Sequence, residues 1–410
     1  MSYIDDVMLS CSFNQTKTMF AIGTDKGFRI YKINNEPNYS LENRIVLYDK
    51  HLDGGLSIVE LYYESNIIAL VGGGKFPKYP KNKVVIFDEE KNHISNEISI
   101  TTEIEINYNN KESYKLSLND NNVSNSKINN VKIKNNLIVV ACEESIHVLN
   151  LFSLQEIDVI DISNSPYKCI IKGLFTINLS NNCNIIVYPD PNKGSVMIKN
   201  YSKNTNLLLN AHDSDIEYIQ LSDDGSLLAT ISEKALCIRV FRTHDGIMLG
   251  KYSLNNTNNA INKENTNKKL EIYCVVFDSD NNYLAANCNN GEIIIFSLNS
   301  IKDKIIAISN VKENNHIKYT SYVTKEIIRS DYINSEGKKM SDIYGIQYVE
   351  ENPYSYFYIK ENIKSISAFI NNNKSISVIT SNGYYYEAKI KEHNCVKLYE
   401  ISLNISEYTK

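Results

Sequence analysis

The sequence contains no tryptophan, and its 410 residues include only 16 glycines and 7 prolines. Disordered low-complexity chains and collagen-like chains are much richer in glycine and proline, so this scarcity indicates a folded globular protein. No apolar run approaches the roughly 18 residues of a membrane span. The N-terminal residues lack a basic start followed by an apolar core. We therefore expect a cytoplasmic protein that meets membranes only at their surface.

An excess of positive charge is also missing. The chain has 43 Lys and Arg against 48 Asp and Glu, which gives a net charge of -5 and a pI near 5.9. Proteins that bind nucleic acids present a basic face, so this balance predicts that the chain does not bind nucleic acid. Any site for an anion must then be local.

The arrangements that support metal binding or catalysis are absent as well. The eight cysteines form no CxxC pair and no close cluster with histidine, which favours reduced, mostly buried thiols. The seven histidines show no metal-ligand spacing. Gly72-Gly73-Gly74 lacks the Lys-Ser/Thr that follows in a phosphate-binding loop. The sequence therefore predicts no enzyme, no catalytic residues, no metal and no cofactor.

Residues 227–252 have the pattern of three consecutive β-strands separated by tight turns. Apolar residues alternate in Leu227–Ile231, a second β-rich run covers Cys237–Phe241, and a third surrounds Met248–Tyr252. Charged residues and an Asp-Gly pair separate the runs. This is a meander, and it is typical of one blade of a β-propeller.

The same strand-rich pattern recurs along the chain, as expected for a repeat fold. Seven units lie at about residues 8–33, 55–98, 131–163, 167–209, 211–253, 270–298 and 363–403. Turn sequences separate the strands, namely Asp25-Lys26-Gly27, Asp224-Gly225, Asn290-Gly291 and Asn382-Gly383. Long amphipathic helical patterns are missing. The sequence predicts an all-β fold, a single seven-bladed β-propeller of the WD-repeat type that spans residues 1–410.

Ring closure and insertions follow from this repeat. Because closure removes free sheet edges, we expect the N-terminal strand near Met8–Phe13 to pair with the last unit at 363–403. Residues 107–130, 254–269 and 299–353 interrupt the repeat and are predicted to be inserted loops. The first two are polar and rich in asparagine. The third mixes aromatic and aliphatic residues with lysines, and a loop of that length is either functional or a disordered linker.

Several stretches resemble one family of propellers. The first is Phe13-Asn14-Gln15 followed by residues 20–31, FAIGTDKGFRIY, and the second is residues 67–74, IIALVGGG. Further similar stretches are Leu137–Val140 with Glu143–Ile146, Ala211-His212, Ser232-Glu233-Lys234 before Ile238–Phe241, and Ile272-Tyr273 before Val275–Phe277. The chain is therefore identified as a member of the PROPPINs, phosphoinositide-binding propellers that act in autophagy.

The resemblance implies sites for phosphatidylinositol 3-phosphate or 3,5-bisphosphate in two rim pockets that flank a Phe/Leu-Arg-Arg-Gly motif. Here Tyr252-Ser253-Leu254-Asn255 takes the place of that motif, so both arginines are replaced. In the first pocket, four residues suit a phosphate: His212, Thr230, Ser232 and Arg239. Ala235 and Leu236 stand where the family has Gly-Thr. In the second pocket, Asn287, Cys288, Glu292 and Ile294 replace the family's Ser, Thr and His, and Glu292 repels a phosphate.

Two further sets of residues follow from the resemblance. Lys268-Lys269 at the end of an insertion either return to the place of the missing arginines or form a solvated loop terminus. Lys75, Phe76, Lys78 and Tyr79 lie in the loop of the second blade where the family contacts a lipid-transfer protein of autophagy. Segment 299–353 corresponds in position to the membrane-inserting loop of the family, and its composition is compatible with an interfacial contact.

The resulting functional prediction is a PROPPIN-like phosphoinositide effector and scaffold. It would recruit autophagy machinery from the cytoplasm to pre-autophagosomal or endosomal and vacuolar membranes, and so take part in protein transport. One alternative is a protein-interaction propeller that has lost lipid binding. A second alternative is an unrelated adaptor of the WD type.

Overall fold

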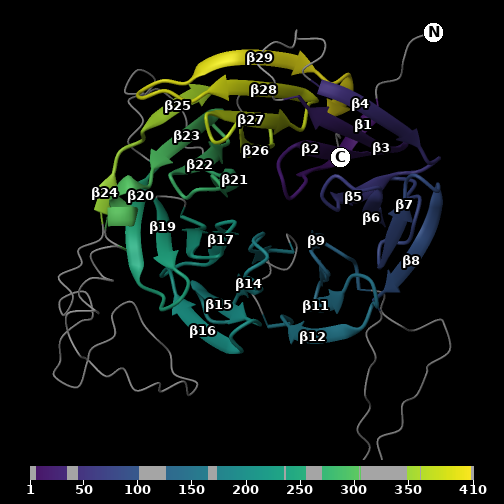
Figure 1. The fold of residues 1–410 in the computed structure, drawn as a ribbon, viewed down its shortest axis with the longest axis horizontal. Coiled ribbons are helices and arrows are strands. Elements are labelled where there is room, and N and C mark those ends of the chain that lie inside the picture. Colours follow the sequence, from purple (N-terminus) through teal and green to yellow (C-terminus); the bar gives the residue numbers. More distant parts are fainter. Residues whose placement is uncertain are drawn as a thin grey trace, which may run out of the picture.

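The structure is a computed structural model, and it describes residues 6–34, 45–100, 126–164, 173–234, 237–254, 270–303, 305, 349–360 and 362–407. These residues form seven sheets, and Figure 1 shows them arranged around a common axis. Neighbouring strands of a blade are antiparallel, apart from two short parallel additions described below. The predicted seven-bladed β-propeller is confirmed.

Blades 1 to 4 come from the first half of the chain. Blade 1 comprises β1 (Asp6–Phe13), β2 (Met19–Thr24), β3 (Gly27–Ile33) and β4 (Ile45–His51). Blade 2 comprises β5 (Leu56–Leu61), β6 (Ile67–Gly72), β7 (Lys83–Asp88) and β8 (His93–Ser99). Blade 3 comprises β9 (Asn130–Lys134), β10 (Leu137–Ala141), β11 (Ser145–Asn150) and β12 (Glu156–Asp161). Blade 4 comprises β13 (Thr176–Ile177), β14 (Ile185–Pro189), β15 (Ser195–Asn200) and β16 (Thr205–Asn210).

Blades 5 to 7 complete the ring. Blade 5 comprises β17 (Ile216–Leu221), β18 (Leu227–Ser232), β19 (Cys237–Arg242), β20 (Met248–Ser253) and β24 (Val349–Glu351). Blade 6 comprises β21 (Ile272–Phe277), β22 (Tyr283–Cys288), β23 (Glu292–Ser297) and β25 (Ser355–Tyr358). Blade 7 comprises β26 (Ser365–Ile370), β27 (Ser375–Thr380), β28 (Tyr384–Lys389) and β29 (Val396–Ser402). The short β30 (Ile405–Glu407) belongs to the sheet of blade 1.

The hydrophobic core is divided among the interfaces between blades. Seven clusters of buried residues each join two neighbouring blades, so apolar packing runs around the whole ring. The cluster between blades 7 and 1 includes Phe20, which stacks on Tyr31 and Tyr385 with ring centroids 4.7 and 5.9 Å away. Buried aromatic and aliphatic side chains therefore join the N-terminal blade to the C-terminal blade and close the ring.

A strand from the C-terminal end of the chain completes the closure. β30 pairs in parallel with the start of β1, with Asp6 opposite Ile405 and Met8 opposite Glu407. The expected pairing of the N-terminal strand is therefore present, but the pairing strand begins two residues beyond the predicted last unit, which ended at residue 403. Leu403 and Ile405 are buried in the cluster between blades 7 and 1.

The margins of the three predicted insertions are described, although most of each insertion lies outside the described residues. Ile128 is buried against blades 2 and 3, and β9 begins at Asn130. Leu254 is buried between blades 5 and 6. Residues 299–303 and 305 are helical, and Ile301 packs in that same cluster. At the far end of the third segment, β24 pairs in parallel with β20 as a fifth strand of blade 5.

A buried lysine occupies the interface between blades 3 and 4. Lys134 is 1% exposed. Its Nζ donates a hydrogen bond to Asn178 Oδ1 at 3.1 Å and a second to the carbonyl oxygen of Cys183. Burial lowers the pKa of Lys134 to about 8. No carboxylate of the described residues forms an ion pair with it, so its charge is an electrostatic cost of folding.

Candidate functional site

Four of the predicted phosphate ligands lie together at the boundary between blades 4 and 5. Thr230 and Ser232 are on β18, and Arg239 is on β19 directly opposite Thr230. His212 lies just after β16, the last strand of blade 4, and its Nε2 is 2.9 Å from Thr230 Oγ1. These four residues, His212, Thr230, Ser232 and Arg239, are called the blade-5 pocket below.

Arg239 has an unused donor in this pocket. Its Nη1 donates a hydrogen bond to the carbonyl oxygen of Ala211 at 2.6 Å. Its Nε is buried and has no hydrogen-bond partner among the described residues. A buried donor of a permanently charged guanidinium is costly to leave unpaired. An anion that accepted a hydrogen bond from Arg239 would remove that cost.

His212 is a neutral member of the pocket. Burial, together with the positive charge of Arg239, lowers the pKa of His212 to about 4. The imidazole is therefore uncharged at neutral pH, where it can donate or accept a hydrogen bond without adding charge. Arg239 is the cation of the blade-5 pocket, and His212 and the two hydroxyls are its polar neighbours.

A glycine of blade 4 holds His212 in position. The backbone nitrogens of Ala211 and His212 both donate to the carbonyl oxygen of Gly194, at 2.9 Å each. Gly194 has φ +72°, and a Cβ atom there would lie 1.7 Å from the carbonyl oxygen of His212. Only glycine allows this close approach of the two backbone segments.

The structure adds a residue that the sequence analysis missed. Lys251 on β20 lies directly opposite Arg239, and Ser253 lies opposite Cys237. Opposed residues of antiparallel strands share one face of the sheet, so Lys251 is a second cation beside Arg239. A β-bulge between Val240 and Phe241 shifts the register of these two strands. Counting along the sequence did not place Lys251 opposite Arg239 because the bulge has no clear sequence signal.

The two positions of the missing arginine pair lie in different surroundings. Ser253 is on the face of blade 5 that carries Arg239. Tyr252 and Leu254 are 0% and 3% exposed in the apolar cluster between blades 5 and 6. Alternation along β20 therefore sends the first position toward the blade-5 pocket and places the second in a hydrophobic environment, where an arginine would be costly.

The four residues at the positions predicted for the second family pocket are buried, namely Asn287, Cys288, Glu292 and Ile294. Cys288 and Ile294 are buried in the same apolar cluster, with Ile301 of the helical segment beside them. Glu292 is 1% exposed and accepts hydrogen bonds from Tyr358 Oη at 2.7 Å and Asn290 Nδ2 at 3.0 Å. Asn287 is hydrogen-bonded to Ser365 and Ser367 of blade 7. All four positions are thus occupied in packing or in internal hydrogen bonds.

Four residues of the first-pocket prediction are not described. Lys268, Lys269, Ala235 and Leu236 lie outside the described residues, so the position of the two lysines relative to the blade-5 pocket stays a prediction.

The predicted partner residues lie on blade 2, in the loop between β6 and β7. The backbone nitrogen of Gly55 donates to the carbonyl oxygen of Phe76 at 2.7 Å, and that of Lys78 donates to the carbonyl oxygen of Gly55 at 3.0 Å. Phe76 is 72% exposed, and Lys75 Nζ lies 5.5 Å from the centre of its ring. Tyr79 instead packs against the cluster between blades 1 and 2. The loop is held by its backbone and presents an aromatic ring and lysines to solvent.

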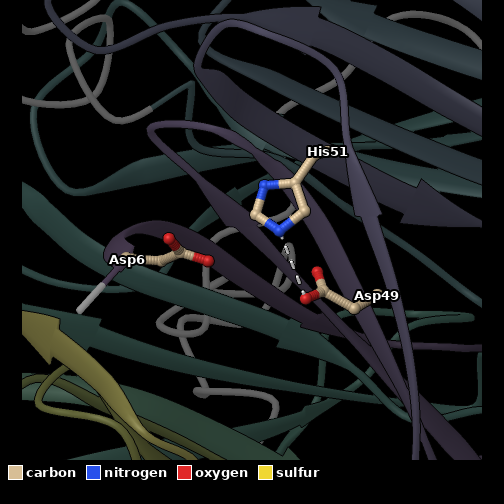
Figure 2. A group of neighbouring side chains, drawn as sticks. All are labelled: Asp6, Asp49 and His51. Carbon is tan, nitrogen blue, oxygen red and sulfur yellow. Dashed lines mark ion pairs between the residues drawn. The ribbon is translucent and has the colours of Figure 1, made fainter. Parts of the chain in front are cut away.

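One group of side chains on blade 1 has the composition of a metal site. Asp6, Asp49 and His51 lie near one another, as Figure 2 shows. Asp6, however, accepts hydrogen bonds from Lys26 and Arg29, each at 2.8 Å. Burial raises the pKa of Asp6, but these two cations outweigh that effect and hold it below its usual value. The group is therefore part of an ion-pair network with Lys26 and Arg29. Arg29 also donates a hydrogen bond to the carbonyl oxygen of Leu403, two residues before β30.

A cavity of about 620 Å³ lies elsewhere, among the first strands of blades 1, 5, 6 and 7. It is separate from the blade-5 pocket, because none of the four pocket residues lines it. In a neighbouring cavity, Lys17 of blade 1 forms an ion pair with Asp223 of blade 5 at 3.2 Å. This contact joins two blades that are not adjacent in the ring.

Comparison with known proteins decides the family. A sequence model described as PROPPIN matches residues 90–402. The chain belongs to the PROPPIN family. This PROPPIN is 26% identical over 292 residues to autophagy-related protein 18e of Arabidopsis thaliana, covering 71% of this chain and 66% of that protein. It is 27% identical over 293 residues to autophagy-related protein 18 of Dictyostelium discoideum, covering 71% and 65%. The match therefore spans slightly less than two thirds of each relative.

Solved structures show the same fold. The structure of Kluyveromyces lactis Hsv2 matches with a TM-score of 0.62 at 14% identity, covering 97% of this PROPPIN and 99% of that chain. A complex of KlAtg21 with the coiled-coil of AgAtg16 matches with a TM-score of 0.62 at 17% identity and the same coverage. The PROPPIN family consists of non-enzymatic propellers, which confirms the prediction that the chain is not an enzyme. Within the described ranges, no helix is long and apolar enough to cross a membrane.

Proposed function

We propose that this PROPPIN binds the headgroup of a 3-phosphorylated phosphoinositide in the blade-5 pocket and so attaches to a membrane surface. The observation that supports this most directly is the buried, unpartnered Nε of Arg239 beside Thr230, Ser232 and His212. A phosphate accepts hydrogen bonds from guanidinium and hydroxyl donors at short range. Lys251, opposite Arg239, adds positive charge to the same face.

We propose only one headgroup site on this propeller, the blade-5 pocket. The positions of the second family pocket are filled by Ile294, Cys288 and the hydrogen-bonded Glu292, and Ser253 and Leu254 replace the arginine pair. Phosphate binding then depends on the guanidinium group of Arg239 and on the positive charge of Lys251. The affinity is therefore expected to be lower than that of a propeller with two intact pockets, and to fall steeply with salt.

The same losses favour a second candidate function. A propeller in which neither pocket retains an arginine pair would serve as a protein-interaction scaffold without lipid binding. The two functions predict opposite results for flotation with vesicles that contain phosphatidylinositol 3-phosphate.

Vesicle flotation distinguishes the two functions. The full chain is expected to float with vesicles that contain phosphatidylinositol 3-phosphate, at least about tenfold more weakly than a two-pocket propeller, because each charge-assisted hydrogen bond contributes roughly 1.5–3 kcal/mol. The matched control is a vesicle of equal negative charge in which phosphatidylserine replaces the 3-phosphate lipid. Equal flotation with both vesicles, or none with either, would contradict the proposal and favour the scaffold.

We further propose that the blade-2 loop contacts the lipid-transfer protein of autophagy. Phe76 is the most exposed large hydrophobic side chain of the described residues, and Lys75 and Lys78 are exposed on either side of it. Neither lysine forms an ion pair with a described residue. An exposed aromatic anchor between unpaired basic residues suits a partner surface with an apolar pocket and acidic residues.

A paired substitution in this loop tests the partner proposal. The variant Phe76→Ser/Lys78→Glu is expected to reduce co-precipitation of the lipid-transfer protein about tenfold or more, because it removes the anchor and reverses one charge. The control Phe152→Ser/Lys374→Glu makes the same changes on blades 3 and 7, where Phe152 is 63% exposed. An equal loss of co-precipitation in both variants would assign the effect to general surface chemistry and contradict the proposal. Vesicle flotation should be unchanged in either variant.

In the cell, these two activities together describe a scaffold that recruits autophagy machinery to phosphoinositide-bearing membranes. We propose pre-autophagosomal or endosomal and vacuolar membranes as its location, peripheral and on the cytoplasmic side.

A further inference from the structure

The cavity of about 620 Å³ near the axis of the ring is separate from the two sites proposed above. Its walls come mainly from the first strands β1, β17, β21 and β26, and Figure 1 shows β17, β21 and β26 on the inner side of the ring. This volume lies in the range of cavities that hold a ligand. It is called the axial cavity below. Part of its wall is apolar and consists of Met8, Leu270, Ile272 and Ile366.

A β-bulge recurs near the start of the first strands. In β1, β17 and β21, the pairing with the next strand shifts by one residue, and β5 of blade 2 has the same shift. The extra residues of β1, β17 and β21 are Leu9, Glu217 and Tyr273, and all three line the axial cavity. A bulge redirects a side chain out of the regular alternation of the strand. The residues at these bulges therefore determine what the axial cavity presents to a ligand.

The loop between β1 and β2 joins several blades near the far ends of their first strands. Gln15 Nε2 donates hydrogen bonds to the carbonyl oxygens of Leu61 on blade 2 at 2.8 Å and of Ile133 on blade 3 at 2.9 Å. Lys17 of the same loop forms the ion pair with Asp223 of blade 5. The axial cavity lies at the opposite end, where β1, β17, β21 and β26 begin. These contacts hold the first strands in place, so the axial cavity is preformed and a ligand need not order it.

The charge at the axial cavity is negative. Three carboxylates line it, those of Glu217, Glu233 and Glu271, and Lys364 is the one lysine or arginine among the described lining residues. Glu271 and Lys364 are exposed, whereas Glu217 and Glu233 are half-buried. Charges beside apolar walls are screened less than charges on an open surface, so a cation that enters is attracted strongly. The axial cavity is thus suited to a ligand that is both cationic and apolar.

We propose that the axial cavity binds an extended segment of a partner protein through an arginine or lysine side chain flanked by apolar residues. The cationic group pairs with Glu217 and Glu271, and the apolar neighbours pack against Leu9 and Ile272. Arginine and lysine suit this wall because their aliphatic stems cover apolar surface while their charged ends bind carboxylates. The same carboxylates repel an acidic segment or a phosphate. The inference does not depend on lipid binding, because none of the four blade-5 pocket residues lines the axial cavity.

Selection from a random heptapeptide library displayed on phage tests this inference. The full chain is the target, and peptides that also bind the variant Glu217→Gln/Glu271→Gln are removed. The variant loses two charges but keeps the size of both side chains, and Glu233 is left unchanged because it follows Ser232 of the blade-5 pocket. We expect the enriched peptides to share one arginine or lysine between apolar residues. Absence of enrichment, or enriched peptides without a shared cation, would overturn the inference.

Fluorescence anisotropy with the selected peptides, made synthetically, measures the affinities. Glu217→Gln/Glu271→Gln should bind them about tenfold or more weakly than the wild type, the effect of losing at least one charge-assisted hydrogen bond. The control Glu143→Gln/Glu144→Gln removes two exposed carboxylates from the loop between β10 and β11 of blade 3. The corresponding loop of blade 5 contributes Glu233 to the axial cavity, but no residue of blade 3 lines it. The control should therefore bind as the wild type does.

Two further comparisons assign the binding to charge and to this cavity. A peptide whose shared cation is replaced by a neutral residue of similar length, citrulline for arginine or acetyl-lysine for lysine, should bind about tenfold or more weakly. Arg239→Ala should bind the peptides as the wild type does, although it is expected to lose flotation, so this inference and the lipid site fail independently. Equal binding by both glutamine variants, or by the charged and neutral peptides, would contradict the inference.

Discussion

Replacing Arg239 by alanine is expected to abolish the binding of this PROPPIN to vesicles that contain phosphatidylinositol 3-phosphate. The blade-5 pocket depends on Arg239 because His212 is neutral and Thr230 and Ser232 carry no charge. Losing two hydrogen bonds to a phosphate, at roughly 1.5 kcal/mol or more each, weakens binding about 100-fold or more. Flotation with and without the 3-phosphate lipid measures this loss.

Two further variants make the result specific to the pocket. Arg239→Lys keeps the charge but not the planar fork, so binding should be intermediate between wild type and Arg239→Ala. Arg242→Ala removes an arginine from the same strand, β19, whose guanidinium is instead paired with Asp245. It should bind as the wild type does. Unchanged binding by Arg239→Ala would show that another site attaches the protein to the vesicle.

Replacing Lys134 by methionine is expected to stabilise the fold near neutral pH by about 1–3 kcal/mol, because it removes an unpaired buried charge. Both acceptors of the lysine keep other partners. Asn178 Oδ1 still accepts from Ile185 N at 2.9 Å, and the carbonyl oxygen of Cys183 still accepts from Asn178 Nδ2 at 3.1 Å. The substitution therefore leaves neither acceptor unsatisfied. Urea unfolding of wild type and variant measures the difference in the free energy of unfolding.

The pH dependence identifies the cause. The pKa of Lys134 is about 8 in the folded protein against 10.5 for an ordinary lysine. Between these values the unfolded chain binds more protons than the folded one, so the wild type gains stability as pH rises, by up to about 3 kcal/mol. The advantage of Lys134→Met should therefore shrink from about pH 7 to about pH 9.5. Tyrosines with raised pKa values oppose this trend equally in both proteins and cancel in the difference.

A surface lysine provides the control for this series. Lys374 is exposed, and its side chain has no partner among the described residues. Lys374→Met should change the free energy of unfolding little, and by the same amount at each pH. A constant difference between wild type and Lys134→Met across the pH range would show that Lys134 is not an unpaired charge in the folded protein.

The architecture of this PROPPIN was largely predictable because it depends on local patterns. Alternating apolar residues and turns such as Asp224-Gly225 mark strands wherever they occur, and seven repeats of that pattern imply a closed ring. Four strands of the blade sheets lie outside every predicted unit, namely β4, β24, β25 and β30. β25 is separated from β23 by more than 50 residues, so its place in blade 6 depends on a pairing that no local pattern indicates.

The candidate site was predictable only in part, for a related reason. His212, Thr230, Ser232 and Arg239 were predicted by resemblance, and the structure brings them together between blades 4 and 5. Lys251 was missed because a β-bulge determines which residue of β20 lies opposite Arg239. The burial of Glu292 depends on tertiary packing, since Tyr358 hydrogen-bonds to it from a strand that is distant in sequence.

The sequence by itself determined the all-β class, the sevenfold repeat, the family and the loss of the arginine pair, because periodicity, turn residues and motifs are properties of neighbouring residues. Only the tertiary structure decided which polar groups are buried and which of these lack a partner. Where separate blades meet, the buried Nε of Arg239 has no hydrogen-bond partner among the described residues, and the buried Lys134 has no carboxylate partner among them. Burial and hydrogen bonding are relations between chain segments far apart in sequence, and those relations set the charge, the affinity and the surface chemistry of the protein.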